Sequence, residues 1–137
     1  MKPETCITIA YSADFFFKKN VGVSLKKKYC APGNPGIAQI AECVSLPSGD
    51  NEAVADFAAD KKIDLLVVGP ELPLCQGVAD AVRAKGIPVF GPSKAGARLE
   101  GSKDFSKQFM VKYGIPTAGY ASFSDCDAAL KYVVKQE

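Results

Sequence analysis

The chain has 137 residues, of which 47% are hydrophobic and 23% charged, so its size and composition are those of one compact folded domain. Its 17 basic and 15 acidic residues give a formal net charge of +2, which is too balanced to indicate a nucleic-acid or membrane partner by bulk electrostatics. It contains no histidine, which excludes Ser-His-Asp and Cys-His catalytic mechanisms.

The chain alternates β-rich and helical runs from residue 5 to about residue 90, which is typical of βαβ units. Residues 6–10 predict a first strand, and residues 12–28 predict a helix of uncertain limits. A short second strand is expected over residues 29–31, before the proline and glycine cluster of residues 32–36. Residues 43–46 predict a weak third strand.

The middle of the chain gives the clearest pattern. A helix is expected over residues 51–60, with Asp50 as its N-cap. Residues 63–68 contain a continuous apolar run that predicts a central parallel strand, covered on both faces. One helical face follows, made of Leu74, Val78, Ala81 and Val82, and residues 87–90 predict the next strand. The fold class is therefore α/β, a Rossmann-like parallel sheet with flanking helices.

The alternation of strands and helices stops at Gly91. Two consecutive helices are expected over residues 93–99 and 102–113, with no strand between them. Residues 117–123 predict an edge strand. Residues 125–135 predict a last helix with its apolar residues turned inward. The first domain is expected to end near residue 90.

Ligands of an open parallel sheet bind outside the carboxyl ends of its strands, where three loops are expected. The loop at residues 11–15 has no glycine, which argues against a dinucleotide or phosphate cradle. In the loop at residues 31–36, Asn34 and Gly36 offer contacts to a sugar or phosphate, and the alternative is a purely structural turn.

The third loop carries Gly69, Pro70 and Glu71 directly after the apolar strand. A carboxylate there pairs with ribose hydroxyls in dinucleotide folds, while the alternative is that Glu71 only favours a helix N-terminus. Lys94 and Lys103 lie near helix starts, where a lysine either contacts a bound phosphate or is simply solvated.

The five cysteines are scattered and include no Cys-x-x-Cys pair, so neither a metal centre nor a disulfide framework is expected. They are interpreted as reduced, mostly buried thiols, which favours a cytoplasmic location. Residues 1–30 carry six lysines against two acidic residues, and the alternative of organelle targeting rests on that segment, although it has no arginine and few serines.

Three segments together resemble the N-terminal part of the phosphoribosylamine–glycine ligase family, ATP-grasp enzymes of purine biosynthesis. They are residues 31–36, which read APGNPG, residues 64–80, which read DLLVVGPELPLCQGVAD, and residues 91–118, which read GPSKAGARLEGSKDFSKQFMVKYGIPTA. Their order and spacing cover about residues 29–123 and make the resemblance specific.

The resemblance implies a reaction that joins glycine to 5-phosphoribosylamine, using ATP and Mg²⁺, through a glycyl phosphate. It implies that residues 1–90 form a pre-ATP-grasp N-domain and that residues 91–137 begin an incomplete ATP-grasp region. It places Lys103 near the ATP phosphates. The substrate-binding residues expected on this scaffold are Asn34, Gly36, Gly69, Pro70 and Glu71. Small-molecule substrates are the expected partners, without nucleic acid or membrane.

The sequence departs from the family in two places. The family has Gly-x-Gly-Gly-Arg-Glu-His in its first loop, where this chain has Tyr-Ser-Ala-Asp-Phe-Phe at residues 11–16, and residues 1–28 are divergent throughout. The chain also stops before the family's glycine-rich ATP loop and metal ligands. We therefore expect a truncated relative or N-terminal fragment that is inactive alone, with no catalytic or metal-binding residue assigned. The alternative is a non-catalytic binding or assembly module.

Overall fold

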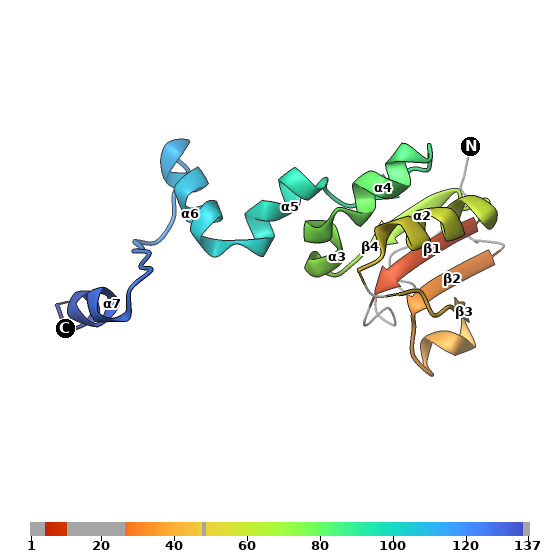
Figure 1. Cartoon of the computed structure of the whole chain (residues 1–137), viewed down its shortest axis with the longest axis horizontal. Coiled ribbons are helices and arrows are strands. Elements are labelled where there is room, and N and C mark those ends of the chain that lie inside the picture. Colours follow the sequence, from red (N-terminus) through yellow and green to blue (C-terminus); the bar gives the residue numbers. More distant parts are fainter. Residues whose placement is uncertain (1–4, 11–26, 48, 136–137) are drawn as a thin grey trace. The chain divides into compact units, whose positions relative to one another are not determined.

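The computed structural model describes residues 5–10, 27–47 and 49–135, and it divides the chain into two units, Met1–Gly101 and Ser102–Glu137 (Figure 1). The first unit holds a parallel sheet with its helices, and the second holds two helices. The helix that follows residue 91 packs with the first unit through its buried Ala97. The family boundary expected near residue 90 stays a prediction.

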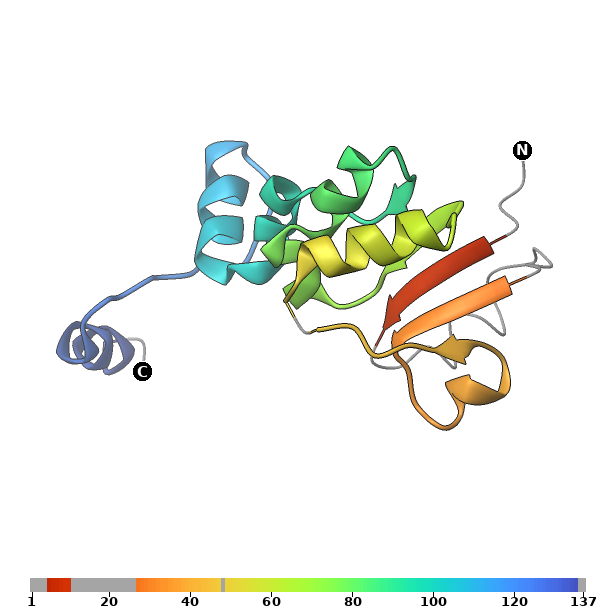
Figure 2. The ribbon, with the colours of Figure 1, turned by 45° about the vertical axis from the view of Figure 1, so that its right-hand side comes forward.

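The first unit is built on a five-stranded parallel sheet, as the α/β pattern predicted. Its strands are β1 (Thr5–Ala10), β2 (Lys27–Pro32), β3 (Glu42–Cys43), β4 (Leu65–Val68) and β5 (Val89–Phe90). Their order in the sheet is β3-β2-β1-β4-β5, so the chain steps outward from β1 to β3 and then crosses to the other side. Figure 2 shows β1 and β2 side by side; in register, Thr8 pairs with Cys30 and with Val67.

The predictions around β2 and β3 need correction. Strand β2 begins at Lys27, so the helix expected over residues 12–28 is wrong for its last two residues, and the rest of it lies outside the described residues. The weak strand expected over residues 43–46 is shorter and earlier, because only Glu42 and Cys43 pair with β2. The apolar strand β4 is confirmed, flanked by β1 and β5.

In the described ranges, strands are connected by η1 (Ile37–Gln39), α2 (Asn51–Asp60), α3 (Glu71–Gln76) and α4 (Val78–Ala84). Helix α5 (Lys94–Gly101) follows the last strand of the sheet. The predicted bounds and cap of α2 are confirmed, since an Asp50 carboxylate oxygen accepts from the Ala53 N–H at 2.9 Å. The single helical face expected from Leu74 to Val82 is instead split, because Gly77 adopts φ +100° between α3 and α4. Only glycine adopts that conformation readily.

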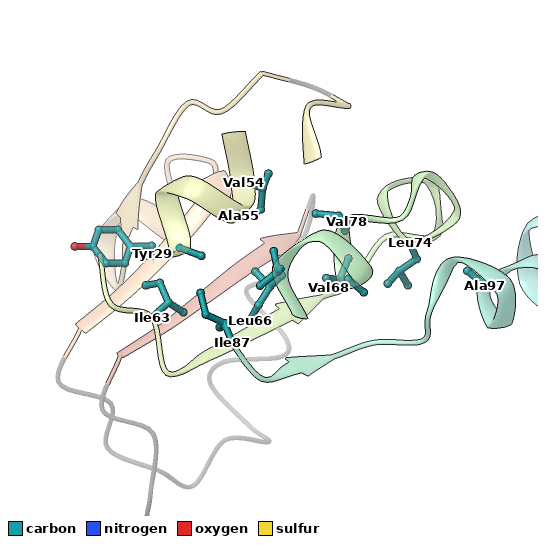
Figure 3. Packing of buried hydrophobic residues seen from close by; sticks show 13 residues of the cluster. Tyr29, Val54, Ala55, Ile63, Leu66, Val68, Leu74, Val78, Ile87 and Ala97 are labelled. Atoms are coloured by element: carbon teal, nitrogen blue, oxygen red, sulfur yellow. The ribbon is translucent and has the colours of Figure 1, made fainter. Parts of the chain in front are cut away.

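The main hydrophobic core lies between the sheet and the helices α2 and α4. Figure 3 shows its side chains, with Val54 from α2, Leu66 from β4 and Val78 from α4 among those gathered there. Leu66 and Val82 are fully buried. The Tyr29 ring on β2 meets Phe57 of α2 edge to face at a centroid distance of 5.4 Å. This packing fixes where α2 begins, at the carboxyl ends of the strands.

The second unit contains α6 (Lys103–Lys112) and α7 (Cys126–Val133), which are capped by the side chains of Ser102 and Asp125. The edge strand expected over residues 117–123 is wrong, because these residues are irregular and pair with no strand among the described residues. Lys107 instead donates to the Thr117 hydroxyl at 2.6 Å. The inward apolar face expected for the last helix is also wrong, since Leu130 and Val133 are each 59% exposed. None of the helices in the described ranges is long and apolar enough to span a membrane.

Candidate functional site

The carboxyl edge of the sheet brings two of the predicted loops together. Strand β1 lies between β2 and β4, and all three run parallel, so the loops after β2 and β4 leave the sheet on either side of the end of β1. Neighbouring strands are about 4.8 Å apart, which separates the starts of the two loops by roughly 10 Å. The strand order also reverses between β1 and β4, the point where open α/β sheets bind ligands. The first-loop prediction, at residues 11–15, lies outside the described residues.

Asn34 shapes the loop after β2. Its side-chain oxygen accepts from the Ile37 N–H at 2.9 Å, and its carbonyl oxygen accepts from the Ala38 N–H at 2.9 Å. This is the structural-turn role that the sequence left open. Within the described ranges, its side-chain nitrogen donates to no other residue and is available to a ligand. Gly36 adopts φ −70°, a conformation that other residues also adopt. Its predicted role in substrate binding therefore depends on its lack of a side chain and not on its backbone conformation.

Gly33 is the residue that makes this loop compact. It adopts φ +79°, and a Cβ there would collide with the Cys43 Sγ and lie 2.9 Å from the Cys43 Cβ. The Cys43 thiol in turn lies 3.7 Å from the Asn34 carbonyl oxygen. The sequence showed a glycine and proline cluster, but it could not show which glycine packs against β3.

The loop after β4 carries the other three predicted residues. Pro70 is the N-cap of α3, and Glu71 is its exposed first residue. The Glu71 carboxylate pairs with no other residue in the part of the chain that the structure describes, so it can accept hydrogen bonds from a ligand. Its position also favours the helix terminus electrostatically. Both interpretations of Glu71 are therefore compatible with the geometry.

A cavity of about 130 Å³ lies beside this edge, between the end of β2, the start of α2 and α3. We call it the α2 cavity. Its lining includes Pro32, Asp50, Asn51, Val54, Leu72 and Gln76. None of the five predicted binding residues is among the described residues that line it. Sequence reasoning missed the cavity because its walls come from three separate segments.

The two lysines predicted near phosphates lie in different units. In the first unit, Lys94 opens α5, where its N–H donates to the Asp80 carboxylate at 2.9 Å. Arg83 holds the preceding segment by donating to the carbonyl oxygens of Val89 at 3.1 Å and Gly91 at 2.5 Å. In the second unit, Lys103 is the exposed first residue of α6. The contacts of Lys94 and Arg83 hold the start of α5 in place.

The cysteines and acidic residues define no metal site in the described ranges. The four described cysteines are free thiols, in agreement with the prediction. Their expected burial is wrong, since Cys30 is buried but Cys43 and Cys126 are exposed, because β3 is an edge strand and α7 is uncovered. No three cysteine, aspartate or glutamate side chains among the described residues are grouped to hold a metal ion.

Comparison with protein families shows what the chain is similar to. The family model described as "Phosphoribosylglycinamide synthetase, N domain" matches residues 17–100. A phosphoribosylamine–glycine ligase of Mesorhizobium japonicum is 58% identical over 109 residues, which are 80% of this chain and 26% of the relative. The protein of the same name from Brucella melitensis biotype 1 is 51% identical over 112 residues, 82% of this chain and 26% of the relative. The chain thus spans about a quarter of the length of the curated relatives it matches.

Proposed function

The chain belongs to the family of phosphoribosylglycinamide synthetase N domains, and we propose that it serves the ligation of glycine to 5-phosphoribosylamine by holding the phosphoribosyl substrate. The proposal rests on the identity of 58% and 51% to two proteins named phosphoribosylamine–glycine ligase. Since the chain matches only 26% of each, we propose that it does not complete the reaction by itself.

The observation that carries the proposed substrate site is the pair of loops on either side of the end of β1. Asn34 supplies an amide nitrogen that bonds to no other described residue on one side, and Glu71 supplies an exposed carboxylate on the other. We propose that Glu71 accepts hydrogen bonds from the ribose hydroxyls and that Asn34 donates to the substrate phosphate or sugar. Gly36, Gly69 and Pro70 leave the edge open, because they place no long side chain in front of it.

ATP is proposed as the co-substrate that activates the glycine carboxylate. The described residue proposed to lie near its phosphates is Lys103, whose amine at the start of α6 carries the charge that a phosphate requires. The free thiols agree with the proposal that the protein works in the cytoplasm. The chemistry proposed for this chain is therefore positioning of the amine substrate, which contributes to rate by proximity and orientation.

Thermal unfolding of the whole chain with added ligands tests the proposal. Ribose 5-phosphate is expected to raise the melting temperature saturably, because a ligand present at ten times its Kd adds about 1.4 kcal/mol of stability. Stabilisation by Mg-ATP that is lost in Lys103→Ala would support the placement of Lys103 near the ATP phosphates. Formation of glycinamide ribonucleotide by the isolated chain would contradict the proposal that the chain does not complete the reaction by itself. Absence of stabilisation by either ligand would favour a non-catalytic assembly module on the same scaffold.

A further inference from the structure

The walls of the α2 cavity suit a flat ring. Val54, Leu72 and Pro32 supply apolar surface from α2, α3 and the end of β2. The cavity volume is about 130 Å³, and a cavity of about 150 Å³ in another protein admits benzene. One flat six-membered ring is therefore the size of group that the cavity accommodates. Phosphoribosylamine has no such ring, because its only ring is the five-membered furanose.

The polar end of the α2 cavity combines an acceptor with a donor. One oxygen of Asp50 caps α2 by accepting from the Ala53 N–H, and no other described residue donates to the second oxygen. Asn51 donates through its side chain to the Gln76 carbonyl oxygen at 2.9 Å, which joins the start of α2 to the end of α3. The Gln76 amide is also beside Gly49, where an added Cβ would lie 3.7 Å from the amide nitrogen and 3.8 Å from the amide oxygen. A carboxylate oxygen and an amide group, which carries both a donor and an acceptor, therefore line the same end.

This polar end selects among ring ligands by charge and hydrogen bonding. The Asp50 carboxylate repels a phosphate or a second carboxylate, so the cavity does not suit an anionic group. It accepts from an amino group, while the Gln76 amide donates to the ring nitrogen beside that amino group. A keto oxygen in place of the amino group would face the carboxylate without a proton between them, and such an unpaired contact is unfavourable.

We propose that the α2 cavity binds the amino-bearing edge of a nucleotide base, the edge that adenine and cytosine share. The ligand is a free nucleotide whose sugar and phosphate extend along the carboxyl edge, past Pro32, which both lines the cavity and opens the loop that carries Asn34. This site is additional to the proposed phosphoribosylamine site, and it gives the chain a second class of ligand.

The test is a calorimetric titration of the whole chain with adenosine, cytidine and inosine 5′-monophosphates. Binding of the two amino-bearing nucleotides is expected to be about tenfold tighter than binding of the inosine nucleotide. Comparison of the adenosine and cytidine nucleotides identifies the natural base class. Asp50→Asn keeps the cap of α2, because asparagine caps helices as well as aspartate does, but it turns the free acceptor into a donor. The variant is therefore expected to reverse the preference toward the inosine nucleotide at an unchanged melting temperature.

Asp60→Asn is the matched control, because it makes the same change of charge at the other end of α2, where it should leave the preference unchanged. An unchanged preference in Asp50→Asn would overturn the proposal, and so would failure of the wild-type chain to bind any of the three nucleotides. Ribose 5-phosphate, which has no base, reports on the substrate site separately. Its binding is expected to be the same in Asp50→Asn, so either site can fail without the other.

Discussion

Replacing Gly33 by alanine tests how the loop after β2 is held in place. Gly33 has φ +79°, and an added Cβ would collide with the Cys43 Sγ and lie 2.9 Å from the Cys43 Cβ. Gly86 also has φ +79°, but a Cβ there meets no atom within 4 Å. The two positions therefore share the backbone cost and differ only in the contact with β3.

The magnitudes follow from these two terms. Gly86→Ala is expected to lower the free energy of unfolding by about 1–2 kcal/mol, the cost of a left-handed conformation with a Cβ. Gly33→Ala is expected to lose the same amount and about 1–3 kcal/mol more, because the added Cβ is overpacked against Cys43. Cys43→Ala in the Gly33→Ala background should restore part of that added loss, because it removes the Sγ and keeps the Cβ.

Urea unfolding followed by circular dichroism at the helical band measures these differences. The chain has no tryptophan, so backbone signal is preferable to fluorescence. Equal losses in Gly33→Ala and Gly86→Ala would refute the reasoning, since they would mean that the loop does not pack against Cys43. Gly33→Ala is also expected to weaken ribose 5-phosphate binding, because it displaces the adjacent Asn34.

Two further predictions concern the packing of the first unit. Leu66→Ala, at a fully buried position, should lower the free energy of unfolding in urea by about 2–5 kcal/mol. Leu72→Ala, at a position 61% exposed, should change it by less than about 0.5 kcal/mol. Equal losses would contradict the assignment of the core. The hydrogen bond from Lys85 to Asp56 raises the pKa of Lys85 above its ordinary value of 10.5. Because the pKa of Lys85 is raised in the folded state, the difference in unfolding free energy between the wild type and Lys85→Met should be constant up to about pH 10 and decline above it. Unfolding at about pH 8 and about pH 11 measures this difference. A difference that grows at high pH would have the wrong sign.

The sequence predicted best where the determinants are local. Helix α2 begins and ends where its cap Asp50 and its apolar spacing placed it. Strand β4 is a continuous apolar run, as an interior parallel strand requires. Ser102 and Asp125 likewise mark the starts of α6 and α7, since a capping side chain satisfies the N–H groups of its own helix.

The errors arose where a partner distant in sequence decides the structure. Lys27 belongs to β2 because the strand pairs with β1 and β3, and its amine lies 3.4 Å from the Glu42 carboxylate across the pair. Residues 117–123 have strand-like composition but no neighbouring strand, and Lys107 ties them to α6 instead. The α2 cavity is formed by three segments that meet only after folding, so no single motif in the sequence predicts it.

Calorimetric titration of ribose 5-phosphate into the wild-type chain and into Glu71→Gln tests the central claim most directly. The claim predicts saturable binding to the wild type and at least tenfold weaker binding to Glu71→Gln, because the variant loses the charged acceptor for the ribose hydroxyls. The melting temperature of free Glu71→Gln should fall only slightly, because the variant loses one negative charge at the start of α3. Glu100→Gln, which changes an exposed carboxylate on α5, should bind as the wild type does. Equal affinity of the wild type and Glu71→Gln, or no binding to either, would contradict a phosphoribosyl site at this edge of the sheet.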